Sequence, residues 1–436
     1  MAVKGLKTSV GLRLFIIGLL SLILLIPTVM IKSLISEREN RRNEATYEVT
    51  SKWGNAQNVS GPILTIPFKS YFKNDKGQVI ESVQYVHFLP DDLSINGAIY
   101  PEIRYRGIYE IILYNTKLKL RGIFHPPDLE ELNIPPDDVL WQDAFVAIGI
   151  NDMKGIKDII KIKWNEAELI ANPGIVCNDV LASGISSPTA LNSQTTDYNF
   201  SVDINLDGSE QLMFMPIGKE TRVTISAKWN NPSFVGEFLP ETRKIQNDAF
   251  SAEWKILHLN RNYPQRWIGN QHKIEHSAFG VRLRLPVDEY QKTMRTAKYA
   301  IMFISLTFLS FFMIEILNKK VLHPVQYLLI GLALILFYTL LLSFSEHLRF
   351  QYAYLIGSVS MSVMITAYTK SVLSNNLLTM IIAGILIILY GFLYIVLQLQ
   401  DYALLLGSIG LFVILAIVMY LTRRIDWFAV WKSEAV

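Results

Sequence analysis

Long apolar segments dominate both ends of this chain. A helix needs about 20 apolar residues to cross a hydrocarbon core of about 30 Å, and six segments meet that length. They are 14–31, 299–317, 325–344, 352–369, 377–397 and 402–421. The pattern therefore predicts one N-terminal membrane anchor and five C-terminal spans, with a long polar segment between them.

Charge follows the same division. The segment 299–422 contains seven charged residues: Glu315, Lys319, Lys320, Glu346, Arg349, Lys370 and Asp401. This is about 6% of the segment, whereas 34–298 carries about 24%, the usual share for a soluble domain. The contrast excludes a purely soluble protein, and 51% hydrophobic residues exclude a disordered chain. A net charge of +3 does not indicate a nucleic-acid partner.

The first apolar segment predicts an uncleaved anchor (1–33), because 32–39 offers no small-residue cleavage site. Basic residues in the short segments set the orientation. With a cytoplasmic N-terminus, nine Lys and Arg residues lie on the cytoplasmic side and only Arg349 lies opposite. Further basic residues flank 34–298 on the outer side, but long domains cross largely regardless of charge. We therefore expect both termini in the cytoplasm, including a tail at 423–436, and 34–298 outside.

The outer segment changes its pattern near residue 59. Residues 34–58 are charged, with Glu48 and Lys52 at i,i+4 spacing, which predicts a helical stalk. From 59 to 298, short runs rich in β-branched and aromatic residues alternate with turn signals such as Ile95-Asn-Gly and Leu206-Asp-Gly-Ser. This pattern predicts a mostly antiparallel β-sandwich-like domain, followed by a five-helix bundle at 299–422. The predicted class is a membrane protein of α plus β type.

Candidate chemistry in the outer segment is sparse. His272-Lys-Ile-Glu275-His276 matches a zinc-peptidase pattern, but that chemistry needs a helix and a third ligand, and the context here is strand or loop. Adventitious surface metal binding and ordinary solvated residues remain alternatives. Cys177, the one cysteine, is either a catalytic thiol or a small buried hydrophobe, and we favour the second because no histidine is near it in sequence. The sequence predicts no enzyme and no cofactor.

Polar residues of the membrane segments lie near predicted helix ends. Glu315 is four residues before Lys319 and is expected to pair with it. The other candidates are His323, Ser345, Glu346, His347 and Asp401. A transporter would place such groups near the midplane, so interface and packing roles are favoured over transport.

Several motifs together resemble the CreD family of bacterial inner-membrane proteins, which is associated with cell-envelope integrity. They are Trp53-Gly-Asn-Ala-Gln, Arg104-Tyr-Arg-Gly-Ile-Tyr, Trp229-Asn-Asn-Pro-Ser-Phe-Val-Gly-Glu-Phe-Leu-Pro240, His323-Pro-Val-Gln-Tyr, Ser345-Glu-His347 and Tyr420-Leu-Thr-Arg-Arg-Ile-Asp-Trp427. The resemblance covers nearly the whole chain. It implies a Gram-negative inner membrane, a periplasmic domain and a link to stress responses, and it implies no enzymatic reaction.

Three functional hypotheses follow. In the first, the periplasmic domain binds an envelope protein or lipid, with a candidate surface formed by Trp229, Pro232, Ser233, Phe234, Gly236, Phe238 and Pro240. The plainer interpretation of that surface is a turn that packs aromatic rings into the sandwich. In the second, the C-terminal bundle transports or handles lipid and has a cavity or lateral groove that reaches Glu315 or Glu346. In the third, the protein is a membrane-tethered hydrolase.

Overall fold

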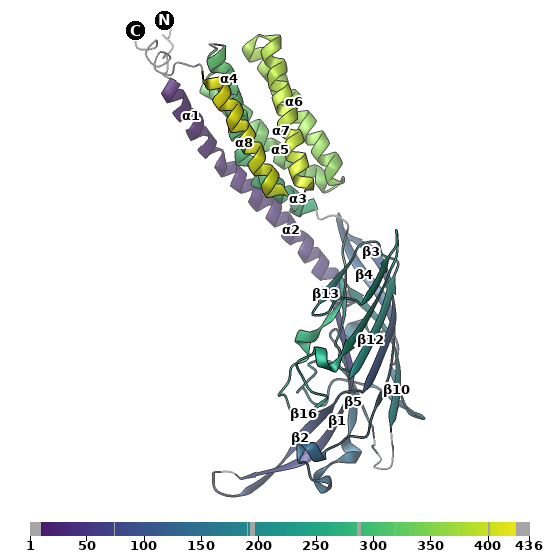
Figure 1. The fold of residues 1–436 in the computed structure, drawn as a ribbon. Helices are drawn as coiled ribbons and strands as arrows, with labels where there is room; N and C mark the ends of the chain where they lie inside the picture. The colour runs from purple at the N-terminus through teal and green to yellow at the C-terminus, as the bar shows by residue number, and fades with distance from the viewer. Residues whose placement is uncertain are drawn as a thin grey trace. The chain divides into compact units, whose positions relative to one another are not determined.

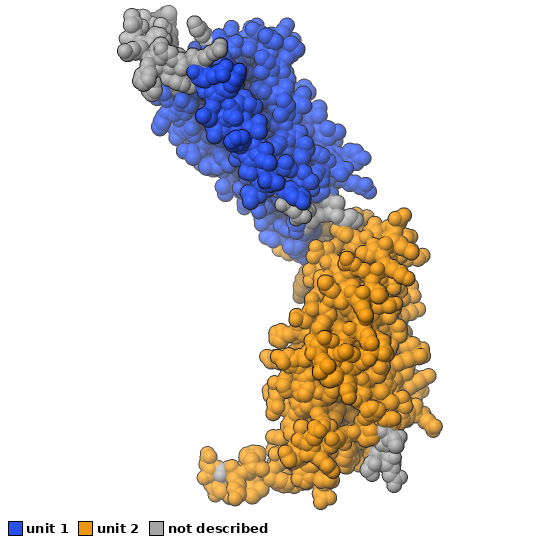
Figure 2. Space-filling view, viewed as in Figure 1, with its two compact units in different colours: residues 1–43, 287–436 blue, residues 44–286 orange. Residues whose placement is uncertain are grey.

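The computed structural model describes residues 10–73, 75–189, 191, 197–285, 289–318, 320–399 and 402–423. The chain divides into two compact units, which Figure 2 colours separately. One unit comprises 1–43 and 287–436, and the other comprises 44–286.

The first unit is helical, and its helices are labelled in Figure 1. Their bounds are α1 (Val10–Ile23), α2 (Leu25–Trp53), α3 (Glu289–Lys298), α4 (Ala300–Leu317), α5 (Pro324–Ser345), α6 (Phe350–Leu373), α7 (Asn376–Gln398) and α8 (Ala403–Thr422). Among the described residues, six helical segments, with α1 and α2 counted as one, are long and apolar enough to cross a membrane. The predicted anchor and five spans are therefore confirmed.

One residue, Leu24, separates the end of α1 from the start of α2, and Pro27 provides the reason. Proline has no backbone N–H, so Pro27 cannot donate to the carbonyl of Ile23, where α1 ends. The polar half of α2 then continues to Trp53, and its residues from Glu44 onward belong to the second unit.

The described part of the second unit is built mainly from two sheets. One has the order β13 (Pro232–Gly236), β17 (Phe279–Leu283), β11 (Gln211–Phe214), β1 (Gln57–Lys73), β5 (Phe145–Ile150), β9 (Gly184–Pro188) and β8 (Asn172–Pro173), with β2 (Val79–Phe88) on β1 and β16 (Arg266–Ile268) on β2. The other has the order β14 (Thr242–Ile245), β15 (Phe250–Leu257), β12 (Glu220–Ala227), β3 (Asp92–Arg106), β4 (Tyr109–Phe124), β10 (Tyr198–Ser209), β6 (Lys161–Trp164) and β7 (Ala167–Ile170). Among these pairs, β1–β11 and β12–β3 are parallel and the others are antiparallel, which confirms the predicted class.

Both sheets contribute to one hydrophobic core. In β12 and β15 buried residues alternate with more exposed ones, as expected when one face of a strand packs inward. The central strand β1 is instead buried on both faces from Val59 to Phe68. The segments that carry Leu129, Ile134, Val139, Val180 and Leu181 belong to the same hydrophobic core as this strand.

Two of the predicted turns are wrong. Asn96-Gly97 lies inside β3, and Asp207-Gly208 lies inside β10. Both glycines are required by close packing rather than by a turn. A Cβ on Gly97 would lie 2.6 Å from Leu118 Cδ2 and 2.8 Å from Ile225 Cδ1, and a Cβ on Gly208 would overlap the Tyr114 ring. The sequence cannot distinguish a glycine in a turn from a glycine at a closely packed position in a strand, because both positions require only that the residue has no side chain.

Candidate functional site

The Trp53-Gly-Asn-Ala-Gln motif forms the joint where α2 passes into β1. Trp53 Nε1 donates to the carbonyl of Tyr114 at 3.4 Å. The guanidinium carbon of Arg104 lies 4.3 Å from the centroid of the Trp53 ring, and Lys157 Nζ lies 5.6 Å from it. Two cations at these distances are attracted by the electron-rich ring face. Trp53 therefore fastens the end of α2 to the second sheet.

A network of side-chain and backbone hydrogen bonds completes the joint. Asn55 donates from its backbone and side chain to Asp152 Oδ2 at 3.0 and 2.7 Å. Gln57 Nε2 donates to the carbonyls of Asp152 and Asp207, each at 2.9 Å, and Gln57 Oε1 accepts from the backbone of Asp152 at 3.1 Å. Gly54 adopts a φ of +153°, and a Cβ there would lie 2.7 Å from the Asp207 carbonyl oxygen. The side chains of Trp53 and Gln57 thus satisfy backbone carbonyl groups, and the side chain of Asn55 binds the Asp152 carboxylate.

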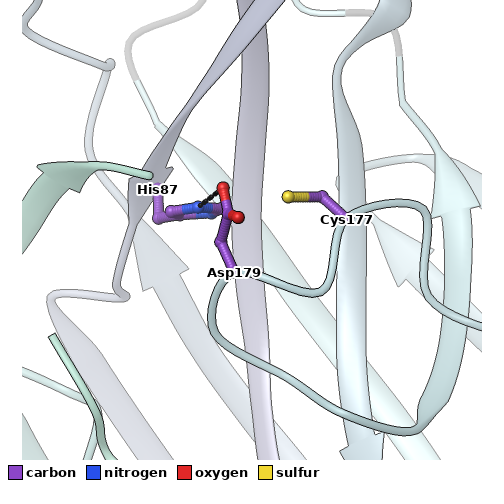
Figure 3. Close-up of side chains that lie close together, drawn as sticks. All are labelled: His87, Cys177 and Asp179. Carbon is purple, nitrogen blue, oxygen red and sulfur yellow. Dashed lines mark hydrogen bonds and ion pairs between the residues drawn. The ribbon is translucent and has the colours of Figure 1, made fainter. Parts of the chain in front are cut away.

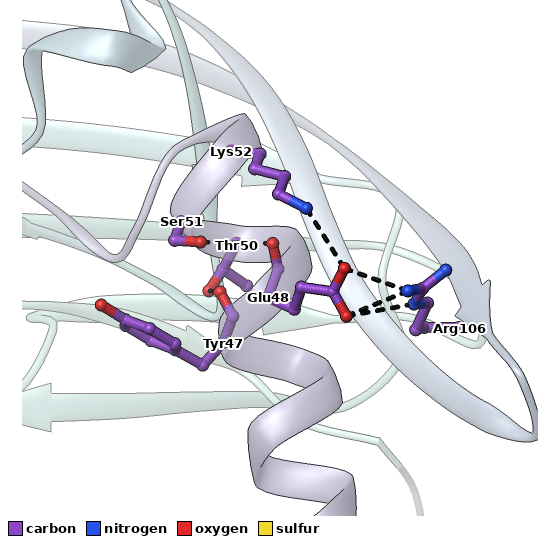
Figure 4. Close-up of polar contacts among 6 residues, drawn as sticks. All are labelled: Tyr47, Glu48, Thr50, Ser51, Lys52 and Arg106. Carbon is purple, nitrogen blue, oxygen red and sulfur yellow. Dashed lines mark hydrogen bonds and ion pairs between the residues drawn. The ribbon is translucent and has the colours of Figure 1, made fainter.

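Glu48 adds a more exposed contact one turn earlier in α2 (Figure 4). Its carboxylate accepts from Lys52 Nζ at 3.1 Å and from Arg106 Nη2 at 3.0 Å. Hydrogen bonds from Lys52 and then from Arg106 hold the pKa of Glu48 below its usual value. Arg106 belongs to the Arg104-Tyr-Arg-Gly-Ile-Tyr motif, so two motifs that are distant in sequence meet at this joint.

The candidate surface Trp229–Pro240 is half-buried rather than freely exposed. It includes β13, at one edge of the first sheet, and the ring of Phe234 packs against Trp254 at a centroid distance of 5.8 Å. Phe238 packs edge-on against Phe279 at 6.1 Å, and Trp229 Nε1 donates to the carbonyl of Arg284 at 3.2 Å. Of the remaining residues, Pro232, Ser233 and Pro240 are partly accessible, and Gly236 is exposed. The rings face the core, and the backbone of the edge strand faces outward.

The three residues of the zinc-peptidase pattern do not form a shared site among the residues that the structure describes. Glu275 and His276 begin a short 3₁₀ helix, η6 (Glu275–Ser277), and both are exposed. His272 packs edge-on against Trp267 at a centroid distance of 5.6 Å. A catalytic pair of histidines on one α-helical face is therefore not formed by this segment.

A different cluster joins His87, Cys177 and Asp179, as Figure 3 shows. His87 lies on β2, and Cys177 and Asp179 lie on the loop that precedes β9. His87 is 2% exposed, while Cys177 and Asp179 are half-buried. Burial lowers the pKa of His87, against the opposing effect of Asp179. Burial and the neighbouring Asp179 raise the pKa of Cys177 to about 11, which does not suit a free nucleophilic thiol.

Sequence reasoning missed this cluster. Cys177 and Asp179 are two residues apart, but nothing in sequence connects them with His87, which stands in an ordinary strand pattern. The expectation that Cys177 is a buried hydrophobe is also incomplete, because its side chain is only partly buried and contacts polar groups.

In the helical unit, Glu315 is 3% exposed and is held by several partners. Arg13 Nη1 lies 3.1 Å from Glu315 Oε1, Tyr327 donates its hydroxyl to Oε2 at 2.9 Å, and the backbone N–H of Leu322 donates at 3.3 Å. Lys319, the partner expected from sequence, lies outside the described residues. The pairing with Arg13 of α1 has no signal in sequence.

The remaining polar candidates have local structural roles. His323 caps α5, since its Nδ1 accepts from the backbone N–H of Val325 at 3.3 Å. Ser345 donates to the carbonyl of Leu342 at 2.9 Å, and Glu346 accepts from the hydroxyl of Tyr290 at 3.1 Å. His347 is exposed, and Asp401 lies outside the described residues. These contacts stabilise helix ends and the packing between helices.

The helical unit contains a small cavity and a larger apolar groove. A cavity of about 20 Å³ lies beside Glu315 and is lined by Arg13 and Tyr327 among others, which is room for about one water molecule. An apolar groove of about 580 Å³ lies between α6 and α7 and is lined by residues that include Ser358, Tyr390 and Gly391. Neither Glu315 nor Glu346 lines this groove.

These features define a multi-pass membrane protein with a large β-sandwich inserted between its first and second spans. The family model described as inner membrane protein CreD matches residues 9–428. The chain is 34% identical to the inner membrane protein CreD of Escherichia coli (strain K12) over 414 residues, which cover 94% of this chain and 91% of that protein. The chain therefore belongs to the CreD family of inner-membrane proteins, as the resemblance predicted.

Proposed function

We propose that this protein supports the integrity of the Gram-negative cell envelope, and that its β-sandwich lies in the periplasm and binds an envelope protein or lipid there. The observation that carries this proposal is a ribbon formed by residues 69–73 and 79–83. Beyond Phe68, β1 pairs only with β2 in the described part of the chain. A two-stranded ribbon is marginally stable by itself, so a partner would add to its stability.

The ribbon exposes apolar side chains. Tyr71, Phe72, Val79 and Val83 are 52%, 50%, 64% and 48% exposed. Contiguous exposed apolar surface on a soluble domain marks an interaction site more often than chance. Lys69 and Glu81 form an ion pair on the same ribbon at 2.9 Å. Lys69 lies opposite Val83 and Glu81 lies opposite Tyr71 in the strand pair, so charged side chains are interspersed with the apolar ones.

The Trp229–Pro240 surface is proposed as a second contact region. Its edge strand β13 pairs with β17 on one side, and a partner strand could add on the other. The half-buried rings support this surface less well than the exposed side chains support the ribbon.

Photocrosslinking in intact cells tests the proposal. A photoreactive phenylalanine analogue replaces Phe72 on the ribbon, Ser233 on β13, or Ile159, a control position that is 78% exposed elsewhere on the sandwich. We expect adducts from Phe72, and weaker adducts from Ser233, that are missing from Ile159. Equal labelling at all three positions, or no adduct from Phe72, contradicts the ribbon as a binding surface.

A complementation assay tests the cellular role. We expect the Phe72→Ser/Val79→Ser double variant to lose protection against detergent and envelope stress in a strain that lacks the protein, while Ile159→Ser retains it. Full protection by the double variant at equal protein levels would contradict the proposal.

Both termini are proposed to be cytoplasmic, on the excess of Lys and Arg in the short segments of that side. Alkaline phosphatase fused after Val436 should be inactive, and the same enzyme inserted at Gly77 in the ribbon turn should be active. The opposite pair of results contradicts this orientation.

A second candidate function, lipid handling by the C-terminal bundle, is favoured by the apolar groove between α6 and α7. Its volume of about 580 Å³ suits an acyl chain. Gly391→Leu fills the groove, whereas Gly384→Leu, on the same helix and also with open space at its Cβ, does not line it. Selective loss of copurifying lipid in Gly391→Leu supports this function, and equal lipid content in both variants contradicts it.

A further inference from the structure

The donor atoms of His87, Cys177 and Asp179 converge in one place. The ring nitrogen, the thiol sulfur and a carboxylate oxygen all lie within 4.8 Å of one another. The three side chains point toward a common centre from β2 and from the facing loop (Figure 3). Imidazole, thiol and carboxylate are the ligand types that Zn²⁺ takes in proteins.

The spacing of two donors already fits a metal ion. His87 Nε2 lies 3.4 Å from Asp179 Oδ2. Two ligands at Zn–N and Zn–O distances of about 2.0 Å are about 3.3 Å apart in a tetrahedral site. The sulfur lies within 4.8 Å of the other two donors, against about 3.5 Å in a tetrahedral site, so it needs to move by about 1.3 Å at most. A small rotation of a side chain on a loop can supply this movement.

The surroundings of His87 orient its ring for this purpose. Thr65 and His87 are paired directly across β1 and β2, and Thr65 Oγ1 lies 2.9 Å from His87 Nδ1. When Nδ1–H donates to the threonine hydroxyl, the lone pair of Nε2 is directed at the cluster. A hydrogen bond of this kind behind the ligand is the usual way in which a protein fixes a metal-binding imidazole. Trp267 packs against the ring at a centroid distance of 5.9 Å and limits its rotation.

An entry path is also present. His87 is 2% exposed and lies at the base of the cluster, whereas the side chain of Asp179 is 29% exposed. An ion can therefore reach the site from solvent, and a water molecule can occupy the fourth position.

We propose that His87, Cys177 and Asp179 bind one Zn²⁺ ion. The sulfur–metal bond forms as the thiol proton is released to solvent, and no electron transfer takes place. The ion joins the loop that carries Cys177 and Asp179 to strand β2, so its effect is to hold this loop against that strand.

Titration of the metal-free, full-length protein in detergent tests the site. Co²⁺ serves as a spectroscopic substitute, because a cobalt–thiolate bond gives an intense near-ultraviolet absorption that oxygen and nitrogen ligands do not give. We expect one equivalent of Co²⁺ to produce this band and Zn²⁺ to displace it. No band, or no competition by Zn²⁺, overturns the proposal.

Variants locate the ion. Cys177→Ser is nearly isosteric and should abolish the band, Asp179→Asn should weaken binding, and Thr65→Val should weaken it about 10-fold through loss of the ring orientation. His276→Ala is the matched control from the zinc-peptidase pattern and should bind normally. A band that survives in Cys177→Ser, or Zn²⁺ binding that is lost in His276→Ala, overturns the assignment.

A further measurement uses the unsubstituted protein, so its result does not depend on whether the variants fold. Cys177 is the single cysteine of the chain, so alkylation by a maleimide reports on this thiol alone. We expect one equivalent of Zn²⁺ to slow alkylation at least 10-fold, and a chelator to restore the rate. An unchanged rate with Zn²⁺ present overturns the proposal.

Discussion

Arg13 Nη1 lies 3.1 Å from Glu315 Oε1, which joins the N-terminal anchor to the first helix of the C-terminal bundle across 302 positions of sequence. The Glu315 side chain is 2% exposed and that of Arg13 is 18% exposed. A carboxylate in this position requires a partner, because an isolated buried charge is costly in an apolar environment.

Removing one partner of this pair should be more harmful than removing both. Arg13→Gln leaves the Glu315 carboxylate without its cation, and we expect a loss of about 3 kcal/mol in the free energy of unfolding. The Arg13→Gln/Glu315→Gln double variant should lose less stability than Arg13→Gln alone, because it leaves no unpaired charge. Thermal or denaturant unfolding in detergent measures these differences. Strictly additive losses would contradict a direct interaction, and Tyr327→Phe, which removes one neutral donor to the same carboxylate, is the control with the smaller expected effect.

The Trp53 joint should depend on the ring more than on its N–H group. Trp53→Ala removes the ring between Arg104 and Lys157, and we expect a loss of about 3 kcal/mol in the stability of the sandwich. Trp53→Phe keeps an aromatic face and loses the bond to Tyr114, so its loss should be about 1 kcal/mol. Unfolding followed by circular dichroism in the β-sheet region distinguishes these values. Equal losses in the two variants would mean that the hydrogen bond, and not the ring, stabilises the joint.

Gly54 should not tolerate a side chain. Its φ of +153° is rarely adopted by other residues, and a Cβ would lie 2.7 Å from the Asp207 carbonyl oxygen. We expect Gly54→Ala to destabilise the protein by about 2 kcal/mol or more. Gly384→Ala, within α7 and with nothing near the added Cβ, should be neutral or slightly stabilising. If both variants unfold at the same temperature, the close approach at Gly54 is not a constraint.

The His125–Asp197 contact should contribute stability only at low pH. His125 Nδ1 lies 2.5 Å from Asp197 Oδ1, and this hydrogen bond, with the nearby charge of Asp91, raises the pKa of His125 despite the opposing charge of Lys219. A raised folded-state pKa means that the stabilisation is complete below the unfolded pKa of about 6.5 and disappears as the pH rises through the folded value. The His125 side chain is 60% exposed, so we expect only about 0.5 kcal/mol.

The comparison of His125→Gln with the parent protein at pH 5 and pH 8.5 measures this effect. At pH 5 the parent protein should be more stable than His125→Gln, and at pH 8.5 the two proteins should be equally stable. A difference of the same size at both values would show that protonation of His125 is not involved.

The sequence alone determined the six spans, because crossing a bilayer depends on the apolar length of one continuous segment. It also determined that the inserted segment is a β-domain and, through short motifs, which family the chain belongs to. Within those motifs, however, the roles of Trp53 and Gln57 were not evident. Their partners Arg104, Asp152 and Asp207 come from strands and loops that approach only when the sandwich has formed.

Tertiary structure decided the remaining features, and the physical reason is the same in each. The sequence predicted Gly97 and Gly208 as turn residues. The structure shows instead that side chains from other strands pack against them. Arg13, 302 positions from Glu315 in sequence, is brought near it by helix packing. His87 meets Cys177 and Asp179 across a sheet face. Local periodicity is set by the backbone of one segment, whereas ion pairs, close packing and metal-ligand geometry depend on which segments the fold brings together.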